Sequence, residues 1–129
     1  KYRIPEQLID FIRTHHGTRK TEYFYQKHKF EFPEEDIDDE AYTYRGPVPF
    51  SKETAVLMMV DSVEAASRSI KMPDEQKISV LVDSIIDGQI KTNQFVNSNI
   101  TFRDIEKIKK ILKKNLVNIY HARIDYTIN

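Results

Sequence analysis

The 129 residues fit a single domain, and a composition of 40% hydrophobic and 31% charged residues excludes an intrinsically disordered chain. The 20 basic and 20 acidic residues cancel, so net charge favours neither nucleic acid nor a membrane surface as a partner. The absence of cysteine excludes disulfides, thiolate nucleophiles and cysteine-bound metals, and no apolar run approaches the roughly 20 residues of a transmembrane helix.

The first predicted helix begins near Pro5, whose ring suits a first helical turn. It ends before Gly17, because glycine commonly follows a helix C-terminus. Two rows at helical spacing lead into a pair of histidines, and we expect both rows to face the core. The rows are Leu8, Ile12 and His15, and Ile9, Ile12 and His16.

A second helix is predicted from Thr18 to about Lys29, and a long acidic loop follows it. Seven of the ten residues 31–40 are acidic, and prolines and a glycine accompany them. Like charges repel and this segment has little to bury, so we expect a mobile surface loop.

Three further helices complete the predicted fold. Ser51 is a suitable N-cap for a helix that continues to about Lys71. Apolar spacing predicts the next helix from residue 74 to near residue 88, and Thr101 with Asp104 resembles a capping box at the start of the last. No strand alternation is evident. The sequence therefore predicts an all-α fold of about five helices with one long acidic loop.

Asp61 is the first candidate for chemistry, because it lies in the most apolar predicted helix, "AVLMMVDSVEAASRS". A buried carboxylate is costly without a partner. We therefore expect Asp61 to be metal-bound, neutral, or paired with a backbone N–H or a basic side chain. Arg68 is instead predicted to pair with Glu64, four residues before it.

His15 and His16 form the second candidate. Adjacent side chains on a helix point about 100° apart, so two imidazoles can share a metal ion only at a helix end or in an unwound turn. The alternative is a structural or solvated role, in which a positively charged imidazole interacts favourably with the C-terminal end of the helix dipole. His28 and His121 are expected to be surface or packing residues.

The last predicted helix is rich in basic residues: Arg103, Lys107, Lys109, Lys110, Lys113, Lys114 and Arg123. Only Asp104 and Glu106 oppose them within the helix. Such a helix can bind phosphates or an anionic membrane, but aromatic residues are not interleaved with the charges. We therefore expect a solvated outer face.

Three stretches carry a family resemblance: "LIDFIRTHHGT", "YRGPVPFSKETAVLMMVDSVEAASRS" and "IYHARIDY". Together they resemble the C-terminal part of the HD-domain metal-dependent phosphohydrolases. The most similar group is the seven-transmembrane HD family, the bacterial membrane-anchored cyclic di-AMP phosphodiesterases. The resemblance covers essentially all of residues 1–129 and implies an HD-domain-like helical bundle of which this chain is the C-terminal part.

The resemblance also implies a two-metal site. His15 and His16 match the family's consecutive histidine ligands to one metal ion, and Asp61 matches the last aspartate ligand to the other. In this family two divalent ions, iron or manganese, bridge a hydroxide that attacks the phosphodiester of a cyclic dinucleotide. Arg68 and Arg45 as phosphate contacts, and Tyr25 as a residue that stacks on adenine, are hypotheses without a motif.

The chain departs from the family pattern because it contains no His-Asp dipeptide. The other ligands are therefore expected upstream of Lys1, with the membrane and extracellular regions of a parent protein whose HD domain is at the cytoplasmic face of a bacterial membrane. We expect the isolated chain to be inactive and to self-associate through uncovered apolar surface. The alternatives are an HD hydrolase of another nucleotide or phosphate ester, and a non-catalytic helical interaction module.

Overall fold

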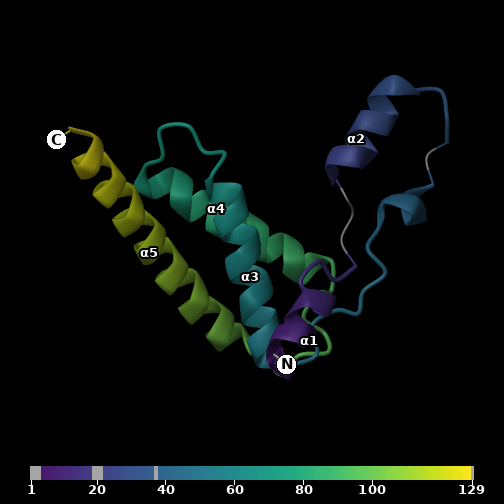
Figure 1. Ribbon diagram of the computed structural model, residues 1–129, viewed down its shortest axis with the longest axis horizontal. Coiled ribbons are helices and arrows are strands. Elements are labelled where there is room, and N and C mark those ends of the chain that lie inside the picture. Colours follow the sequence, from purple (N-terminus) through teal and green to yellow (C-terminus); the bar gives the residue numbers. More distant parts are fainter. Residues whose placement is uncertain (1–3, 19–21, 37, 129) are drawn as a thin grey trace.

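The computed structural model describes residues 4–18, 22–36 and 38–128, which form helices and no β-strand, as the sequence predicts (Figure 1). The elements in chain order are α1 (Glu6–Thr14), α2 (Glu22–Glu31), the 3₁₀ helix η1 (Asp39–Tyr42), α3 (Lys52–Ser67), α4 (Glu75–Lys91) and α5 (Phe102–Ile128). No helix in these ranges combines the length and the apolar content that a bilayer-spanning segment needs.

Helices α3, α4 and α5 pack against one another, and α1 packs on α3. The α2 and η1 helices contact each other and no other described element. They project as a separate arm at one side of the bundle (Figure 1). The predicted acidic loop thus contains a short helix, because Asp38 caps η1 by accepting a hydrogen bond from the Glu40 N–H at 3.0 Å.

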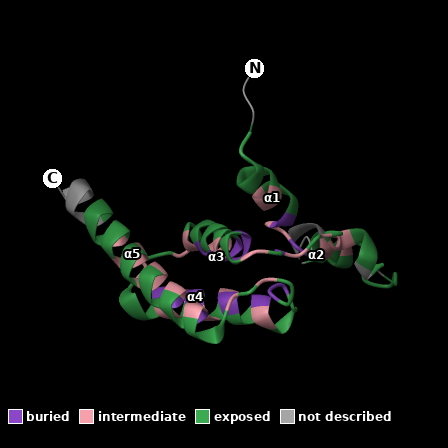
Figure 2. Ribbon diagram, turned by 90° about the horizontal axis from the view of Figure 1, so that it is seen from below, coloured by how far each residue is buried: buried purple, intermediate pink, exposed green. Residues whose placement is uncertain are grey.

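The hydrophobic core lies between α3, α4 and α5, and Figure 2 shows most buried residues on α3, α4 and the connection after α4. Ile78, Val82 and Ile86 are spaced four residues apart and form the buried stripe of α4. The core cluster comprises Ala55, Met58, Met59, Val63, Ile78, Val82, Ile86, Phe95 and Ile105.

Two predicted helix ends were wrong. The helix from Ser51 ends at Ser67 rather than near Lys71, because the Ser67 and Ser69 hydroxyls donate to nearby backbone carbonyls at 2.7 and 2.8 Å. The next helix passes through Gly88 and ends at Lys91, where Asn93 adopts a left-handed φ of 61°. The predicted start of the second helix at Thr18 is also early, since α2 begins at Glu22 and residues 19–21 lie outside the described part.

The predicted caps are confirmed. Ser51 forms a capping box with Thr54 at the start of α3. At the start of α5 the Thr101 N–H donates to the Asp104 carboxylate at 3.0 Å, and the Asp104 N–H donates to the Thr101 hydroxyl at 3.0 Å. The Lys52 ammonium group lies 3.3 Å from the same carboxylate, so Asp104 also ties the start of α5 to the start of α3.

These contacts make the Asp104 cap sensitive to acid. The Thr101 N–H, then the Thr101 hydroxyl and Lys52, lower the pKa of Asp104. Since a lowered pKa in the folded state favours the ionised carboxylate, this stabilisation is present above the ordinary pKa of 3.8 and is lost as pH falls through the pKa of the folded state. The urea concentration at the unfolding midpoint should fall as the pH is lowered from about 5 to about 2. We expect this fall to be smaller in the Asp104→Asn variant, because asparagine has no carboxylate to protonate. The matched control, Asp36→Asn in the acidic segment, should leave the decline unchanged. An unaltered acid profile for Asp104→Asn contradicts this role.

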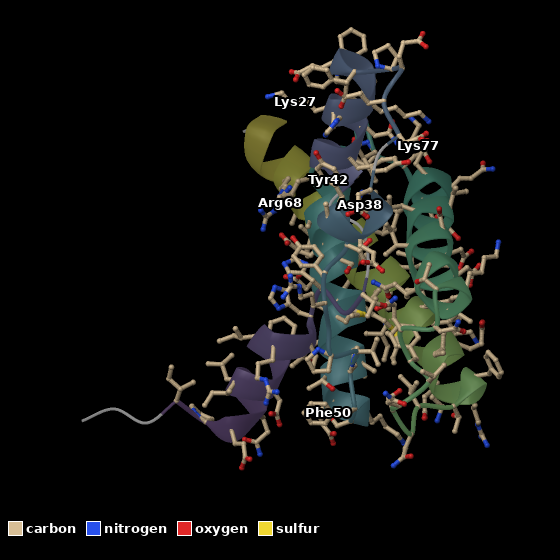
Figure 3. All side chains as sticks on the ribbon, turned by 90° about the vertical axis from the view of Figure 1, so that its right-hand side faces the viewer. Lys27, Asp38, Tyr42, Phe50, Arg68 and Lys77 are labelled. Atoms are coloured by element: carbon tan, nitrogen blue, oxygen red, sulfur yellow. The ribbon has the colours of Figure 1, made fainter. Side chains whose placement is uncertain are left out.

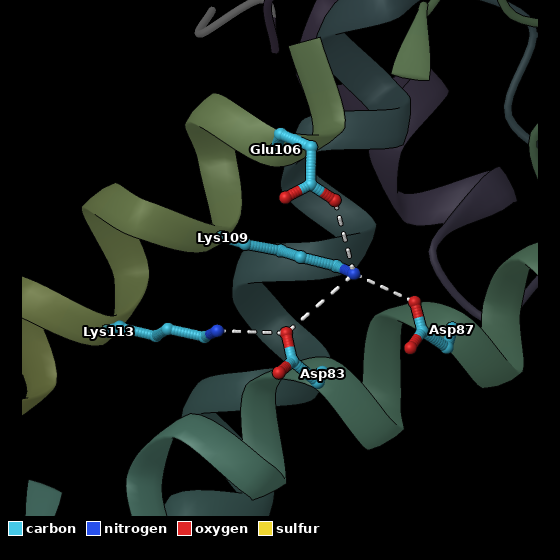
Figure 4. A network of polar contacts seen from close by, with 5 residues as sticks. All are labelled: Asp83, Asp87, Glu106, Lys109 and Lys113. Carbon is cyan, nitrogen blue, oxygen red and sulfur yellow. Dashed lines mark hydrogen bonds and ion pairs between the residues drawn. The ribbon is translucent and has the colours of Figure 1, made fainter. Parts of the chain in front are cut away.

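Lys109 is buried at the interface of α4 and α5, contrary to the prediction of a solvated basic face (Figure 4). Its ammonium group donates to Asp87 at 2.8 Å and lies 3.7 Å from Asp83 and 3.6 Å from Glu106. Lys113 pairs with Asp83 at 2.9 Å. The hydrogen bond to Asp87 raises the pKa of Lys109 and outweighs the opposing effect of burial.

The sequence prediction missed this network because the opposing carboxylates come from another helix. Asp83 and Asp87 lie four residues apart on one face of α4, which is the spacing that meets Lys109 and Lys113 on α5. The rest of the prediction holds: Arg103, Lys107, Lys110 and Lys114 are exposed along α5.

Candidate metal site

The paired histidines lie in the turn that ends α1. Thr14 is the last helical residue, and His15 retains helical backbone angles. Gly17 is buried and adopts a left-handed φ of 52°, and its N–H donates to the Thr14 carbonyl at 2.9 Å. The predicted role of Gly17 beyond the helix end is confirmed. The chain therefore unwinds directly after the two imidazoles, which is the condition under which neighbours can face one ion.

Backbone carbonyls orient the His15 ring. Its Nδ1 lies 3.1 Å from the Phe11 carbonyl oxygen and 2.9 Å from the Ile12 carbonyl oxygen. A carbonyl oxygen only accepts hydrogen bonds, so Nδ1 carries the proton that is donated. In the neutral ring the lone pair is then on Nε2, and a backbone partner of this kind orients many metal-binding histidines.

The His16 ring lies between His15 and Tyr44. Its centroid is 3.9 Å from that of His15, and it stacks on Tyr44 at 4.2 Å with an interplanar angle of 10°. Both histidines are half-buried. Sequence reasoning missed Tyr44, and the available signal was that Tyr44 begins the stretch "YRGPVPFSKETAVLMMVDSVEAASRS", which carries part of the family resemblance. The stacked rings keep the two imidazoles together at the end of α1.

Asp61 is exposed, so the prediction that its carboxylate is buried was wrong. The reason is that α3 is covered unevenly. Thr54 and Met58 lie on the same row and are buried, whereas Leu57 and Val60 beside Asp61 are 39% and 38% exposed. An exposed carboxylate needs no internal partner, and Asp61 is accessible to an external cation.

The predicted inward rows of α1 are also largely uncovered. Leu8, Ile9 and Ile12 are 47%, 42% and 56% exposed, because α3 is the only described helix that α1 contacts and Thr14 is the only buried residue of α1. Helices α1 and α3 therefore present exposed apolar side chains and the exposed Asp61 carboxylate, whereas the two half-buried imidazoles lie directly after α1.

Those candidate ligands do not form a complete metal site by themselves. Among the residues that the structure describes, no three His, Asp or Glu side chains lie close enough to hold an ion. The donors nevertheless fit a divalent cation, since imidazole nitrogen and carboxylate oxygen suit iron, manganese and zinc, and the His15 proton is on Nδ1 rather than Nε2.

The candidate substrate contacts are spread over the molecule. Arg68 lies at the end of α3 and binds Glu64 through two hydrogen bonds of 2.9 and 2.8 Å, which confirms the predicted pair. Arg68 lines a cleft together with Tyr120 and Arg123 of α5 (Figure 3). Arg45 is exposed beside η1. Tyr25 belongs to the α2–η1 arm, where its ring meets Tyr42 edge-on at 6.0 Å.

The two other histidines have other surroundings. The His28 ring hydrogen-bonds to the Tyr42 hydroxyl and lies 3.2 Å from the Glu35 carboxylate, within the α2–η1 arm. His121 is exposed on α5. The prediction that His28 and His121 are packing or surface residues is confirmed.

No family model matches the chain, but individual proteins do. The chain is 39% identical over 125 residues to the cyclic-di-AMP phosphodiesterase PgpH of Bacillus subtilis, and 41% identical over 123 residues to that of Listeria monocytogenes. These matches cover 97% and 95% of the chain but only 17% of each relative. The chain thus corresponds to a small part of these longer proteins.

Solved structures extend the similarity to the fold. The crystal structure of the L. monocytogenes PgpH HD domain matches with a TM-score of 0.82 at 38% identity, over 92% of this chain and 54% of that one. The structure of the same domain in complex with cyclic-di-AMP matches with a TM-score of 0.84 at 39% identity, over 91% of this chain and 54% of that one. The predicted HD-domain fold is confirmed, and the chain spans about half of the crystallised domain.

Proposed function

We propose that this chain, which is homologous to part of the PgpH HD domain, belongs to a metal-dependent phosphodiesterase that hydrolyses cyclic di-AMP. The observation that carries the proposal is the match to the HD domain in complex with cyclic-di-AMP, at 39% identity and a TM-score of 0.84. The term complete HD domain is used below for this chain together with the rest of the domain to which it corresponds.

In the proposed site His15 and His16 bind one divalent ion and Asp61 binds the other. The Nδ1 proton of His15 supports this role, because a neutral imidazole with its proton on Nδ1 carries the lone pair that can bind a metal on Nε2. The exposed Asp61 carboxylate supports it as well. The other ligands come from the rest of the complete HD domain. Bound divalent ions, iron or manganese in this proposal, activate water and neutralise phosphate charge.

This chain also shapes the substrate side of the site. Arg68 follows Asp61 by two helical turns, or about 10 Å along α3, and its exposed guanidinium donates two hydrogen bonds to the Glu64 carboxylate, which orient it. An oriented guanidinium suits a phosphate oxygen, so Arg68 is our first candidate for a substrate contact. Arg45 and Tyr25 stay weaker predictions, since each lies by the α2–η1 arm.

We propose further that the uncovered apolar face is where the rest of the complete HD domain packs. The face comprises Leu8, Ile9 and Ile12 of α1 with Leu57 and Val60 of α3. Burying these side chains against the rest of the domain stabilises the packed state by about 25 cal/mol for each Å² of apolar surface that is removed from water. The isolated chain should instead self-associate through this face, and a sedimentation experiment that finds only monomer contradicts the assignment. Placement of the parent protein at the cytoplasmic face of a bacterial membrane is likewise a proposal.

Turnover assays with two proteins test the proposed function. The complete HD domain loaded with Mn²⁺ should hydrolyse cyclic di-AMP, and the isolated 129-residue chain should not, because His15, His16 and Asp61 are too few ligands for two ions. Product formation is measured by chromatography, with cyclic di-GMP and a phosphomonoester as parallel substrates. Faster turnover of either parallel substrate contradicts the substrate assignment. A complete domain that turns over none of them contradicts the enzyme.

A further inference from the structure

We propose that Gln94 is a positioning residue that fixes the turn carrying His15 and His16. This inference rests on the proposed function, because it assigns a role to Gln94 in metal binding by that pair. Gln94 lies in the connection between α4 and α5, 76 residues after Thr18, to which it is hydrogen-bonded. No local sequence pattern links the two segments.

The Gln94 side chain is completely buried and fully engaged with its surroundings. Its Oε1 accepts a hydrogen bond from the Thr18 N–H at 2.9 Å. Its Nε2 donates to the Thr18 hydroxyl at 3.0 Å and to the Thr92 carbonyl at 2.9 Å. Two of these three hydrogen bonds therefore join Gln94 to Thr18, which lies two positions after His16. Because a buried amide without partners is costly, this arrangement strongly favours one placement of the turn.

Contacts around Gly17 reinforce this placement. A Cβ atom added to Gly17 would lie 2.0 Å from Gln94 Oε1 and 3.0 Å from the Met58 terminal methyl group. The turn is thus pressed against the Gln94 amide on one side and against α3 on the other. Only glycine leaves room for the amide here, and glycine adopts this φ of 52° without the strain that a side chain would add.

The Thr18 side chain extends the same arrangement to Tyr44. A Cβ atom added to Gly46 would lie 3.4 Å from Thr18 Cγ2, so the segment after Tyr44 runs beside Thr18. Tyr44 in turn stacks on His16 at 4.2 Å. Gln94 consequently supports both the backbone that follows the histidines and the segment that supplies the stacking ring.

A second buried glutamine provides a matched comparison. Gln89 is 2% exposed and lies five residues earlier, but its Nε2 donates to the Ser62 hydroxyl on α3 at 2.9 Å. Its Oε1 has no hydrogen-bond partner among the described residues. The Gln89 side chain therefore connects α4 to α3, and within the described part of the chain it makes no hydrogen bond to residues 14–18. Loss of Gln89 should destabilise the fold without moving the imidazoles.

Metal affinity of the complete HD domain separates positioning from general stability. Gln94→Ala should weaken Mn²⁺ binding by about 10–100-fold, the range expected when a group that orients a metal ligand is removed. Gln89→Ala should leave Mn²⁺ affinity within about twofold, although both variants lower the urea midpoint. Titration calorimetry gives the affinities. If Gln89→Ala weakens Mn²⁺ binding as much as Gln94→Ala, Gln94 is merely structural and the proposal is overturned.

Two further measurements keep the test independent of metal binding and of folding. Without metal, the ring nitrogen chemical shifts of His15 and His16 in the 129-residue chain should change in Gln94→Ala and stay unchanged in Gln89→Ala. Unchanged shifts in Gln94→Ala overturn the positioning role. If instead His15→Ala and His16→Ala leave Mn²⁺ affinity unaltered while these shifts behave as expected, the metal assignment fails and the positioning survives. Gln94→Glu keeps the acceptor for the Thr18 N–H and replaces Gln94→Ala if that variant does not fold, with changes in the same direction.

Discussion

Replacing Asp61 with alanine in the complete HD domain is expected to lower cyclic di-AMP turnover by at least about a thousandfold. Metal ions contribute several kcal/mol of transition-state stabilisation, and each 1.4 kcal/mol corresponds to a factor of about ten in rate. Since Asp61 is exposed, the same change should alter the unfolding free energy of the 129-residue chain by no more than about 0.5 kcal/mol. Loss of turnover without loss of stability distinguishes a ligand from a structural residue.

The matched control is Glu53→Ala, which removes another exposed carboxylate from α3. Glu53 lies in the first turn of α3, where its negative charge interacts favourably with the N-terminal end of the helix dipole. The change should therefore affect stability slightly and turnover not at all. Both rates come from the same chromatographic assay with Mn²⁺. Retention of more than about a tenth of the turnover by Asp61→Ala contradicts its assignment as a metal ligand.

The second large effect concerns Met58, at which the core meets the histidine turn. Met58 is fully buried on α3, and its terminal methyl group would lie 3.0 Å from a Cβ atom at Gly17. Met58→Ala removes three heavy atoms from a packed position and leaves a cavity. We expect a loss of about 2–5 kcal/mol in unfolding free energy, measured by urea denaturation.

Two controls separate the cavity from other effects of the Met58 substitution. Met58→Leu keeps most of the side-chain volume and should cost less than about 1.5 kcal/mol. Met72→Ala makes the same chemical change at a residue that is 83% exposed, and it should cost no more than about 0.5 kcal/mol. Equal losses for Met58→Ala and Met72→Ala would show that Met58 packing does not stabilise the fold.

Local patterns in the sequence predicted most of the helical fold. The spacing of Ile78 and Val82, and the caps at Ser51 and Thr101, correspond to the observed helices because backbone hydrogen bonds and helical periodicity act over a few residues. Gly17 was identified for the same reason. Helix ends shifted where a side chain competed for a backbone partner, as Ser67 does at the end of α3.

Burial and long-range partners could not be predicted in this way. Asp61 lies on an apolar helix and is nevertheless exposed, because exposure depends on which neighbouring helix covers a face. Lys109 is buried because Asp83 and Asp87 from α4 meet it. Gln94 contacts a residue 76 positions away. Each of these contacts depends on how helices pack, and periodicity within one helix contains no information about it.

The candidate site followed from family resemblance more than from spacing. His15 and His16 alone were compatible with a solvated helix end, and the structure adds the orientation of the His15 ring by backbone carbonyls. Gln94 and Tyr44, which hold the turn and the His16 ring, became visible only in three dimensions. The surroundings of the His15-His16 pair therefore come from residues that are distant in the sequence, which a local pattern does not contain.

The metal content of the purified complete HD domain tests the central claim most directly. Elemental analysis should find about two divalent ions per chain, as a two-metal site requires. It should find about one in a variant that carries both His15→Ala and His16→Ala, since these residues are assigned to one ion and Asp61 to the other. Full metal content in this double variant, or none in the unaltered domain, contradicts the assignment of the two histidines as metal ligands.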